Sequence, residues 1–252
     1  MFTIGCDPEF FLKRNNKHVS AVGLIGGSKD FPRPLEKDGF AILEDNVSVE
    51  FNVAPAHNHE EFIQNIQYVM SNLKELLPEY EFSRDAAVVF NPEDLAHPQA
   101  QEFGCEPDFN AWTRKINPRP KAPDQNLRSA GGHVHIGHEN TLDPIEVIRA
   151  MDVFAGVPAT KLDQDIRRRQ LYGKAGCHRI KDYGCEYRTL SNFWIFEPAL
   201  IKWVFEQTQK AVQFVKDGHR VNEDHAAAIQ ACINDNDGNA YEYIVQTYGL
   251  AR

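Results

Sequence analysis

Four short apolar segments, interrupted by charged or imidazole side chains, constrain the fold of this chain more than any other feature. They read CDPEFF, VSVEFNV, GGHVHIG and CEYRTL. Residues i and i+2 of a β-strand point to the same face. If the four segments are strands of one sheet, one face collects about five carboxylates, two imidazoles and an arginine. Such a cluster cannot be buried unless hard cations neutralise it.

Strand periodicity predicts which of these side chains share a face. The sets are Asp7 with Glu9, Ser48 with Glu50 and Asn52, His133 with His135, and Glu186 with Arg188. Each set alone has an ordinary explanation, such as a solvated strand edge, a zinc-type histidine pair or a cross-strand salt bridge. Together, oxygen ligands with only one or two imidazoles favour Mg²⁺ or Mn²⁺ over Zn²⁺. An arginine among them indicates a bound polyanion, most simply a nucleotide phosphate.

Composition limits the classes of protein that fit. The chain has 252 residues and a formal net charge of −9 at pH 7, which suits one large domain or two small ones. The acidic balance argues against broad contact with nucleic acid. Since no apolar run approaches the roughly 18 residues needed to cross a bilayer, we expect no membrane association. Five cysteines without a CxxC motif indicate free thiols in a reducing cytoplasm.

The order of helices and strands predicts the fold class. Helices are expected over 59–77, from Pro144 to Pro158, over 197–217 and, as two short helices, within 221–248. The first is supported by the capping pair Asn58 and Glu61. Residues 91–127 are rich in proline, asparagine and charge and indicate a loop-rich insertion, while residues 165–184 show no periodicity. Because strands and helices do not alternate strictly, we expect an α+β fold with a mostly antiparallel sheet.

The motifs, taken in order, resemble a known superfamily. GCDPEFFL, DNVSVEFN, SAGGHVHIG and YGCEYRTLSNFW are similar to segments of the glutamine synthetase / glutamate–cysteine ligase superfamily, and the likeness runs from residue 4 to about residue 197. Within it, the chain most resembles the phage-type carboxylate–amine ligases (COOH-NH2 ligase type 2, phiEco32-like). The resemblance implies a single catalytic domain over residues 1–252. In such a domain a curved antiparallel sheet carries the active site and helices pack on its other face.

The resemblance also implies two divalent metal ions. Glu9, Glu50 and an acid just upstream would hold the first, and Asp7, His133 and Glu186 the second. Two acids compete for the upstream position. Glu44 has the strand parity to face Glu50, whereas Asp45 matches the family better and is expected in a turn, where parity does not apply. We favour Asp45. The chain departs from larger relatives in having Asp7 where they have glutamate, which leaves room for a more hydrated Mg²⁺.

The same resemblance implies roles for several cations. Arg188 would bind the transferred phosphoryl group, and His135 would lie beside the phosphate or the substrate carboxylate. The segment RRRQLYGKAGCHR is expected to form a mobile cationic lid, although a solvated basic loop is an equal alternative. In the lid, Gly173 and Gly176 would give flexibility and allow close approach of the backbone. The residues expected to contact ATP are Arg168, Lys174, Arg179, Arg188 and Asn52, with Arg179 also assisting catalysis.

A second short motif, GCEPDF, repeats the letters of GCDPEF with its acids exchanged. The flanking sequences differ, so we do not interpret the pair as an extended duplication. Two acids around a proline present carboxylates from a constrained bend. We hypothesise that Asp108, assisted by Glu106 or Asn110, binds a cationic amine substrate, with Arg128 as a further substrate contact. A surface loop with coincidental letters is the alternative.

We therefore predict an ATP-dependent carboxylate–amine ligase that uses Mg²⁺ or Mn²⁺ and releases ADP through an acyl-phosphate intermediate. Its partners would be small-molecule or peptide carboxylates and amines, and the resemblance implies peptide or cell-wall substrates. Two other classes stay open. One is a phosphotransferase of the same fold, as in guanidino kinases, and the other is a non-catalytic, metal-stabilised phage binding protein. The sequence does not indicate the oligomeric state.

Overall fold

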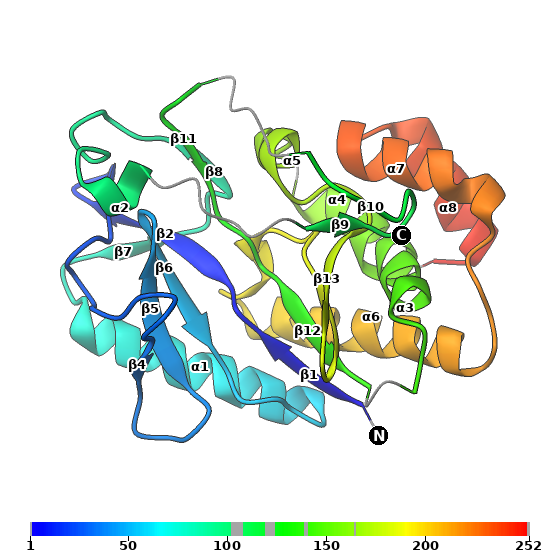
Figure 1. The fold of residues 1–252 in the computed structure, drawn as a ribbon, viewed down its shortest axis with the longest axis horizontal. Coiled ribbons are helices and arrows are strands. Elements are labelled where there is room, and N and C mark those ends of the chain that lie inside the picture. Colours follow the sequence, from blue (N-terminus) through cyan, green and yellow to red (C-terminus); the bar gives the residue numbers. More distant parts are fainter. Residues whose placement is uncertain (1, 102–107, 119–123, 139–140, 164, 251–252) are drawn as a thin grey trace.

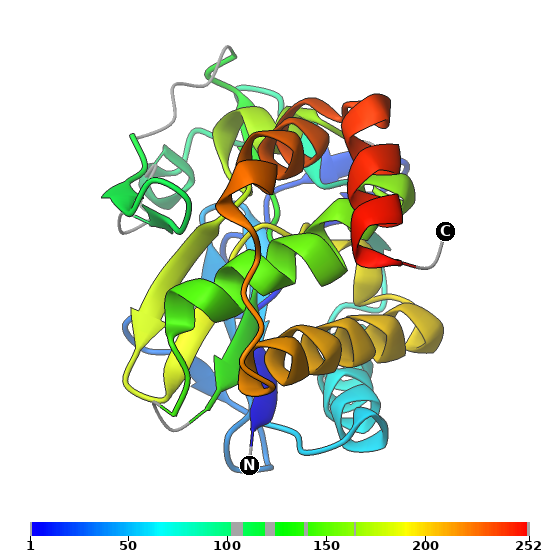
Figure 2. The ribbon, with the colours of Figure 1, turned by 90° about the vertical axis from the view of Figure 1, so that its right-hand side faces the viewer.

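The structure is a computed structural model that describes residues 2–101, 108–118, 124–138, 141–163 and 165–250. It has the α+β fold expected from the sequence, with antiparallel sheets on one side and helices on the other (Figure 1). Figure 2, turned by 90°, shows the helices stacked against one face of the strands. Side chains of the four motifs gather on the other side of the strands.

Two six-stranded sheets and a two-stranded ribbon account for the strands of the described residues. The first sheet has the order β1 (Thr3–Cys6), β12 (Val134–Gly137), β14 (Gly184–Tyr187), β13 (Cys177–Lys181), β9 (Phe109–Asn110) and β10 (Lys115–Ile116). The second has β3 (Lys17–Val19), β2 (Glu9–Arg14), β6 (Ser48–Asn52), β5 (Ala41–Asp45) and β4 (Arg33–Pro34), with β7 (Glu81–Ser83) paired to β2. The ribbon pairs β8 (Ala87–Val89) with β11 (Leu127–Ser129).

The two sheets meet where the first strand segment breaks. Pro8 lacks a backbone N–H and interrupts the strand between β1 and β2. β1 continues into the first sheet by pairing with β12, whereas β2 enters the second by pairing with β6. Backbone bonds from Phe51 N to Pro8 O and from Val53 N to Cys6 O, both 3.3 Å, span the break. The junction therefore fixes Asp7 and Glu9 at the seam between the sheets.

Helices cover the far face. The longer ones are α1 (His59–Leu76), α3 (Pro144–Met151), α6 (Pro198–Lys216), α7 (Ala226–Asp235) and α8 (Gly238–Tyr248). The Asn58 side chain caps α1 by accepting from Glu61 N at 2.9 Å, which confirms the predicted capping pair. α1 buries Phe62, whose ring stacks on Trp194 with centroids 5.8 Å apart. These apolar contacts join the helices and the sheets in one continuous core.

One sequence prediction about helices was wrong, and two segments contain more regular structure than the sequence indicated. Pro158 does not end the helix that begins at Pro144, because the chain passes through a π-helical turn at Asp152–Gly156 and continues as α4 (Val157–Leu162). A π-helical turn changes the hydrogen-bond pattern just before Pro158, so the missing N–H is tolerated there. Residues 165–184 also contain regular structure, namely α5 (Arg167–Leu171) and β13, and residues 91–127 include the short helix α2 (Pro98–Gln101).

No helix within the described ranges combines the length and apolar character required to cross a bilayer. The four described cysteines, Cys6, Cys177, Cys185 and Cys232, are buried and free of disulfides.

Candidate active site

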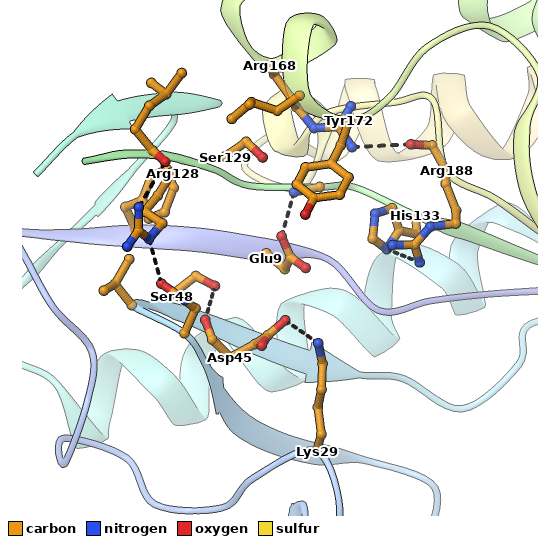
Figure 3. Close-up of a pocket in the computed structure, with 16 residues that line it drawn as sticks. Glu9, Lys29, Asp45, Ser48, Arg128, Ser129, His133, Arg168, Tyr172 and Arg188 are labelled. Atoms are coloured by element: carbon orange, nitrogen blue, oxygen red, sulfur yellow. Dashed lines mark hydrogen bonds and ion pairs between the residues drawn. The ribbon is translucent and has the colours of Figure 1, made fainter. Parts of the chain in front are cut away.

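The first acidic group comprises Glu9, Asp45 and Glu50, and one carboxylate oxygen from each lies within 4.8 Å of the others. Glu9 comes from β2, while the other two come from the β5–β6 hairpin. The hairpin pairs Asp45 with Ser48 and Leu43 with Glu50, so Asp45 shares the face of Glu50. Figure 3 shows Glu9 and Asp45 around a cavity of about 70 Å³. The three residues brought together are those that the resemblance assigned to the first metal.

Glu44 lies on the other face of the hairpin and has a different contact set. Its carboxylate accepts from the backbone N–H groups of Gly23, Ile25 and Gly26 at 2.8–2.9 Å, which holds the preceding loop against β5. The expectation that Glu44 faces Glu50 because both numbers are even was wrong. The two-residue turn pairs odd positions of β5 with even positions of β6, so Leu43 lies opposite Glu50 and Glu44 lies opposite Val49. Asp45 is also the last residue of β5 rather than part of a turn, so strand register explains its position.

The carboxylates of this group repel one another, and burial makes their negative charge more costly. Burial raises the pKa of Glu50 well above its usual range, and the charges of Asp7, Glu9 and Asp45 raise it further. Lys29 offsets part of this repulsion, with Nζ 2.7 Å from Oδ2 of Asp45. Three converging carboxylates with a single lysine suit a hard divalent cation, which takes oxygen ligands.

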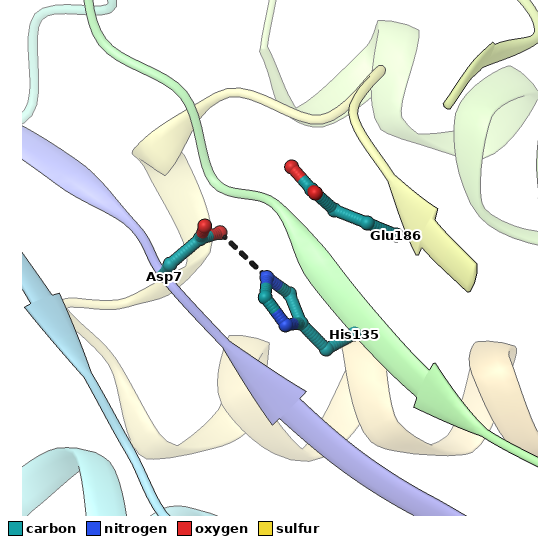
Figure 4. Close-up of side chains that lie close together, drawn as sticks. All are labelled: Asp7, His135 and Glu186. Atoms are coloured by element: carbon teal, nitrogen blue, oxygen red, sulfur yellow. Dashed lines mark ion pairs between the residues drawn. The ribbon is translucent and has the colours of Figure 1, made fainter. Parts of the chain in front are cut away.

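The second group brings together Asp7, His135 and Glu186 from three adjacent strand segments (Figure 4). One ligand atom from each lies within 4.8 Å of the others, and His135 Nε2 is 3.0 Å from Asp7 Oδ1. Asp7 Oδ1, His135 Nε2 and Glu186 Oε2 are buried, and none of them has a well-aligned hydrogen bond among the described residues. Their close contacts are ion pairs, between His135 Nε2 and Asp7 Oδ1 and between Lys181 Nζ and Glu186 Oε2, the latter at 3.1 Å. Since buried polar atoms are normally hydrogen-bonded, two carboxylates and an imidazole arranged in this way fit a divalent cation.

His133 lies at the edge of this group rather than at its centre. Its Nδ1 is 3.3 Å from Asp7 Oδ1, 3.7 Å from Glu186 Oε1 and 3.4 Å from Arg188 Nη1. Its ring packs so closely on Gly131 that a Cβ there would lie 2.3 Å from Nε2. The first glycine of the GGHVHIG segment is therefore required for the position of His133, and the structure brings both histidines to the acids.

Neighbouring charges set the protonation of the second group. Burial alone would raise the pKa of Asp7, but the imidazoles of His135 and His133 hold it well below the usual range. Burial would lower the pKa of His135, and the charge of Asp7 raises it instead. For Glu186, the charge of Arg188 overcomes burial and lowers the pKa to about 2. Both carboxylates are thus anionic at neutral pH.

The predicted arginines lie at different depths. Arg188 is buried and its Nη1 contacts Glu186 Oε1, while Arg179 Nη1 is 3.9 Å from the same oxygen. Arg168 is also buried and donates to the carbonyls of Thr189 and Arg188 at 2.8 and 3.2 Å. Figure 3 shows its guanidinium above Glu9. Lys174, by contrast, is exposed.

The segment expected to be a mobile lid is packed into the fold at Arg168. A Cβ on Gly173 would lie 1.7 Å from Nη1 of Arg168, so this glycine, at a φ of 73°, permits the close backbone approach expected from the sequence. Gly176, at a φ of 74°, similarly lies against Trp112.

The predicted substrate residues divide into two kinds. Asp108 Oδ2 lies 3.9 Å from Arg188 Nε, and Asp108 Oδ1 accepts from Asn117 Nδ2 at 3.0 Å. Asn110 instead stabilises its own turn by accepting from the backbone N–H groups of Trp112 and Thr113. Glu106 lies outside the described residues. Asn52 pairs with Ala41 at the end of β6, on the face of Glu50.

Arg128 lines the first cavity from β11, but much of its hydrogen bonding is structural. It donates to Asn46 Oδ1 at 3.0 Å and to the carbonyls of Ala100 and Gln125, each at 2.8 Å. It thereby ties the β5–β6 turn to the insertion, and burial lowers its pKa.

A second cavity, of about 450 Å³, opens beside β13 and was not predicted from the sequence. Its lining combines apolar Phe109, Ile145 and Ile180 with His178 and the cations Arg114, Arg179 and Lys181. Lys181 Nζ lies 3.1 Å from Glu186 Oε2. Arg179 and Lys181 therefore connect this cavity to Glu186, whereas Arg188 lines the first cavity.

Three site residues escaped sequence reasoning: Lys29, Lys181 and Tyr183. Lys181 and Tyr183 lie near the β13–β14 hairpin, and a strand assignment for residues 177–181 would have placed Lys181 on the face of Glu186. Lys29 lies in a loop, where no periodicity indicates its direction.

Acidic groups, imidazoles and buried arginines gather where the two antiparallel sheets meet, and the family that residues 123–246 match is one of carboxylate–amine ligases. The family model described as "Phage phiEco32-like COOH.NH2 ligase-type 2" matches residues 123–246. This part of the chain, which includes the HVH and EYR motifs, belongs to that family, and the resemblance seen in the motifs is confirmed. A search of curated proteins finds no match.

Proposed function

We propose that the protein is an ATP-dependent, ADP-forming carboxylate–amine ligase that acts through an acyl phosphate. One observation carries the proposal: Asp7 and Glu9, two residues apart on one segment, belong to two different ligand groups. Arg188 contacts Glu186 of one group and lines the cavity of the other. Two adjacent cation sites with a buried arginine are suited to neutralising a phosphoryl group during transfer.

The chemistry explains why ATP is required. A carboxylate does not accept an amine directly, because an oxide is a very poor leaving group. In the first step a carboxylate oxygen of the substrate attacks the γ-phosphorus of ATP, and ADP leaves. In the second, the bound ammonium group first loses a proton, the amine nitrogen attacks the acyl carbon, inorganic phosphate leaves and the nitrogen loses a second proton. Divalent cations, when bound, would supply charge neutralisation and orientation for the phosphate oxygens.

The chain's own residues have distinct roles in this scheme. Glu9, Asp45 and Glu50 would hold one cation, and Asp7 and Glu186 with a histidine would hold the other. Arg188 would fork onto two oxygens of the transferred phosphoryl group. Asp108, 3.9 Å from Arg188, would attract the protonated amine to the side of the acyl group.

We assign the nucleotide to the cavity beside β13. Its volume of about 450 Å³ falls within the usual range for small-molecule sites. Phe109 and Ile180 offer an apolar wall for a base, while Arg179 and Lys181 lie between that wall and Glu186. The carboxylate substrate would then enter from the smaller cavity around Glu9. Since the reaction consumes ATP, we place the protein in the cytoplasm, and we propose peptide or cell-wall type substrates.

The test is a screen for ADP release and amide formation with pairs of carboxylates and amines, in the presence of ATP and Mg²⁺. The proposal requires that rapid ADP release depend on both a carboxylate and an amine, with a new amide detected by mass spectrometry. ADP release with one acceptor, accompanied by a stable phosphorylated product, would instead establish a phosphotransferase. Absence of nucleotide binding would favour a non-catalytic binding protein.

A further inference from the structure

The imidazole of His135 is held by a residue outside both acidic groups. The Tyr183 hydroxyl lies 2.6 Å from Nδ1 of His135. The two rings stack with centroids 5.9 Å apart and an interplanar angle of 16°. His135 is therefore fixed in both ring plane and rotation, with Nε2 turned to Asp7, as Figure 4 shows for His135 and Asp7.

Tyr183 is itself fixed by the backbone. It lies with Asp182 in the two-residue turn between β13 and β14, and its carbonyl oxygen accepts from His138 N at 2.9 Å. Gly184 follows at a φ of 152°, and a Cβ there would lie 2.2 Å from the carbonyl oxygen of Ile136. This close approach packs the turn against β12. The tyrosine ring is thus anchored to the strand that carries His135.

The hydrogen bond at Nδ1 decides what Nε2 can do. A neutral imidazole carries one proton, so Nε2 has a free lone pair only when the proton is on Nδ1. The Tyr183 oxygen can accept that Nδ1–H. Metal-binding histidines commonly donate their other ring N–H to an oxygen acceptor, which orients the ring.

His133 is less well placed to be the ligand. The nitrogen that faces the acids, Nδ1, also lies 3.4 Å from the Arg188 guanidinium, which can only donate. Its other nitrogen faces Gly131. The lone pair of Nδ1 is therefore shared with Arg188.

We propose that Tyr183 is a positioning residue that holds His135 as the Nε2 ligand of a divalent cation bound with Asp7 and Glu186, while His133 supports Arg188. The proposal deepens the proposed function by naming the imidazole ligand of one of its two cation sites, and it rests on that function only for the presence of the cation. It departs from the assignment of His133 implied by the family resemblance.

The experiment measures Mn²⁺ binding to the full chain without nucleotide, by calorimetry and by electron paramagnetic resonance. Tyr183→Phe keeps the stacked ring and removes only the hydroxyl. We expect it to weaken one class of Mn²⁺ site by roughly 10- to 100-fold, the range found for residues that orient metal ligands. His135→Ala should weaken the same site more, and His133→Ala less. Tyr243→Phe, on α8, is the matched control and should leave Mn²⁺ affinity unchanged.

A second measurement reports the tautomer directly. Nitrogen-15 NMR of the Mg²⁺-bound protein should show His135 protonated at Nδ1, and this signal should shift or become mixed in Tyr183→Phe. Unchanged Mn²⁺ affinity in Tyr183→Phe, a larger loss in His133→Ala than in His135→Ala, or no Mn²⁺ binding by the wild type would each overturn the proposal. Ligase activity is assayed separately. If the wild type binds Mn²⁺ but forms no ADP, the proposed function fails while the assignment of Tyr183 still stands or falls on the binding data.

Discussion

Glu186 of β14 pairs directly with His135 of β12 across the first sheet. On its other side it pairs with Arg179 of β13, and its own strand brings Arg188 against its carboxylate. A fully buried carboxylate thus stands between an imidazole that faces one acidic group and cations that line the second cavity. Changes at this position should affect the cation site and the phosphate site together.

Glu186→Gln is expected to lower the rate of ADP formation by at least about 100-fold while the protein stays folded. The amide keeps the size of the carboxyl group but removes the charge that a cation and Arg188 share. Mutation of residues that merely orient metal ligands lowers metal affinity or activity roughly 10- to 100-fold, so loss of a ligand itself should lower activity more. Steady-state kinetics at saturating Mg²⁺ and circular dichroism test this. Glu197→Gln, at an exposed pair with Arg84, serves as the control. Normal turnover by the Glu186 variant would contradict a two-cation site.

Arg188→Lys should lower kcat by roughly 10³-fold, with a smaller change in KM for ATP. A guanidinium forks onto two phosphoryl oxygens, whereas an ammonium acts as a single point charge. Arginines that stabilise phosphoryl transfer contribute about 10³ to 10⁵ in rate. The comparison variant is Arg84→Lys, at an exposed arginine. If kcat is unchanged, the contact with Glu186 is simply a structural ion pair.

Mg²⁺ or Mn²⁺ with ATP should raise the melting temperature, because ligands that bind only the native state stabilise it. At 100 times Kd the gain is about 2.7 kcal/mol, or roughly 5 to 10 °C for a chain of this size. Differential scanning fluorimetry measures the shift. Glu50→Gln should raise the melting temperature without ligand, since it relieves repulsion, and should reduce the response to metal. An unchanged melting temperature at millimolar metal and nucleotide would contradict the proposal.

Asp108→Asn should raise the apparent KM for the amine and spare ATP hydrolysis that occurs without amine. The asparagine keeps an oxygen for Asn117 but loses the charge that would attract an ammonium group. Because the carboxylate lies 3.9 Å from Arg188, KM for the amine and kcat must be measured separately. An effect confined to kcat would assign Asp108 to the orientation of Arg188, and no effect would leave it without a role in catalysis.

Asp152 predicts a pH dependence of stability. Burial raises its pKa to about 7, although Tyr187, Trp112 and Thr189 donate to its carboxylate. Between its ordinary pKa near 4 and pH 7, the folded state binds more protons than the unfolded state, so this group makes the free energy of unfolding fall as pH rises. Urea denaturation at pH 5 and pH 8 should show this fall. The fall should be smaller in Asp152→Asn, in which the amide can still accept from Trp112 and donate to the hydroxyl of Tyr187. If the free energy of unfolding falls equally with pH in the wild type and in Asp152→Asn, Asp152 does not cause the fall.

Much of the scaffold could be predicted from the sequence because local rules specify it. The Asn58–Glu61 cap predicted the start of α1, and the constrained bend expected at Pro8 lies between β1 and β2. Strand alternation also indicated which acids would lie together, since residues i and i+2 of a strand point to the same face in any sheet.

The remaining features depend on pairing register or on distant contacts. The choice between Glu44 and Asp45 depended on the length of one turn, and parity along the sequence gave the wrong answer for Glu44. Trp112 Nε1 lies 2.7 Å from Asp152 Oδ2 across 40 positions, a contact that no local pattern indicates. The burial of Arg168 likewise depends on carbonyl groups of residues 188 and 189, which are adjacent only after folding.

The break at Pro8 also limits how the site can vary. Asp7 and Glu9 serve different ligand groups, yet they are separated by one residue and by strands that enter different sheets. An insertion or deletion at Pro8 would change the register of β1 against β12, of β2 against β6, or of both. The tripeptide Asp7–Pro8–Glu9 therefore fixes the distance between the two acidic groups. Changes in substrate preference are expected in segments outside this tripeptide.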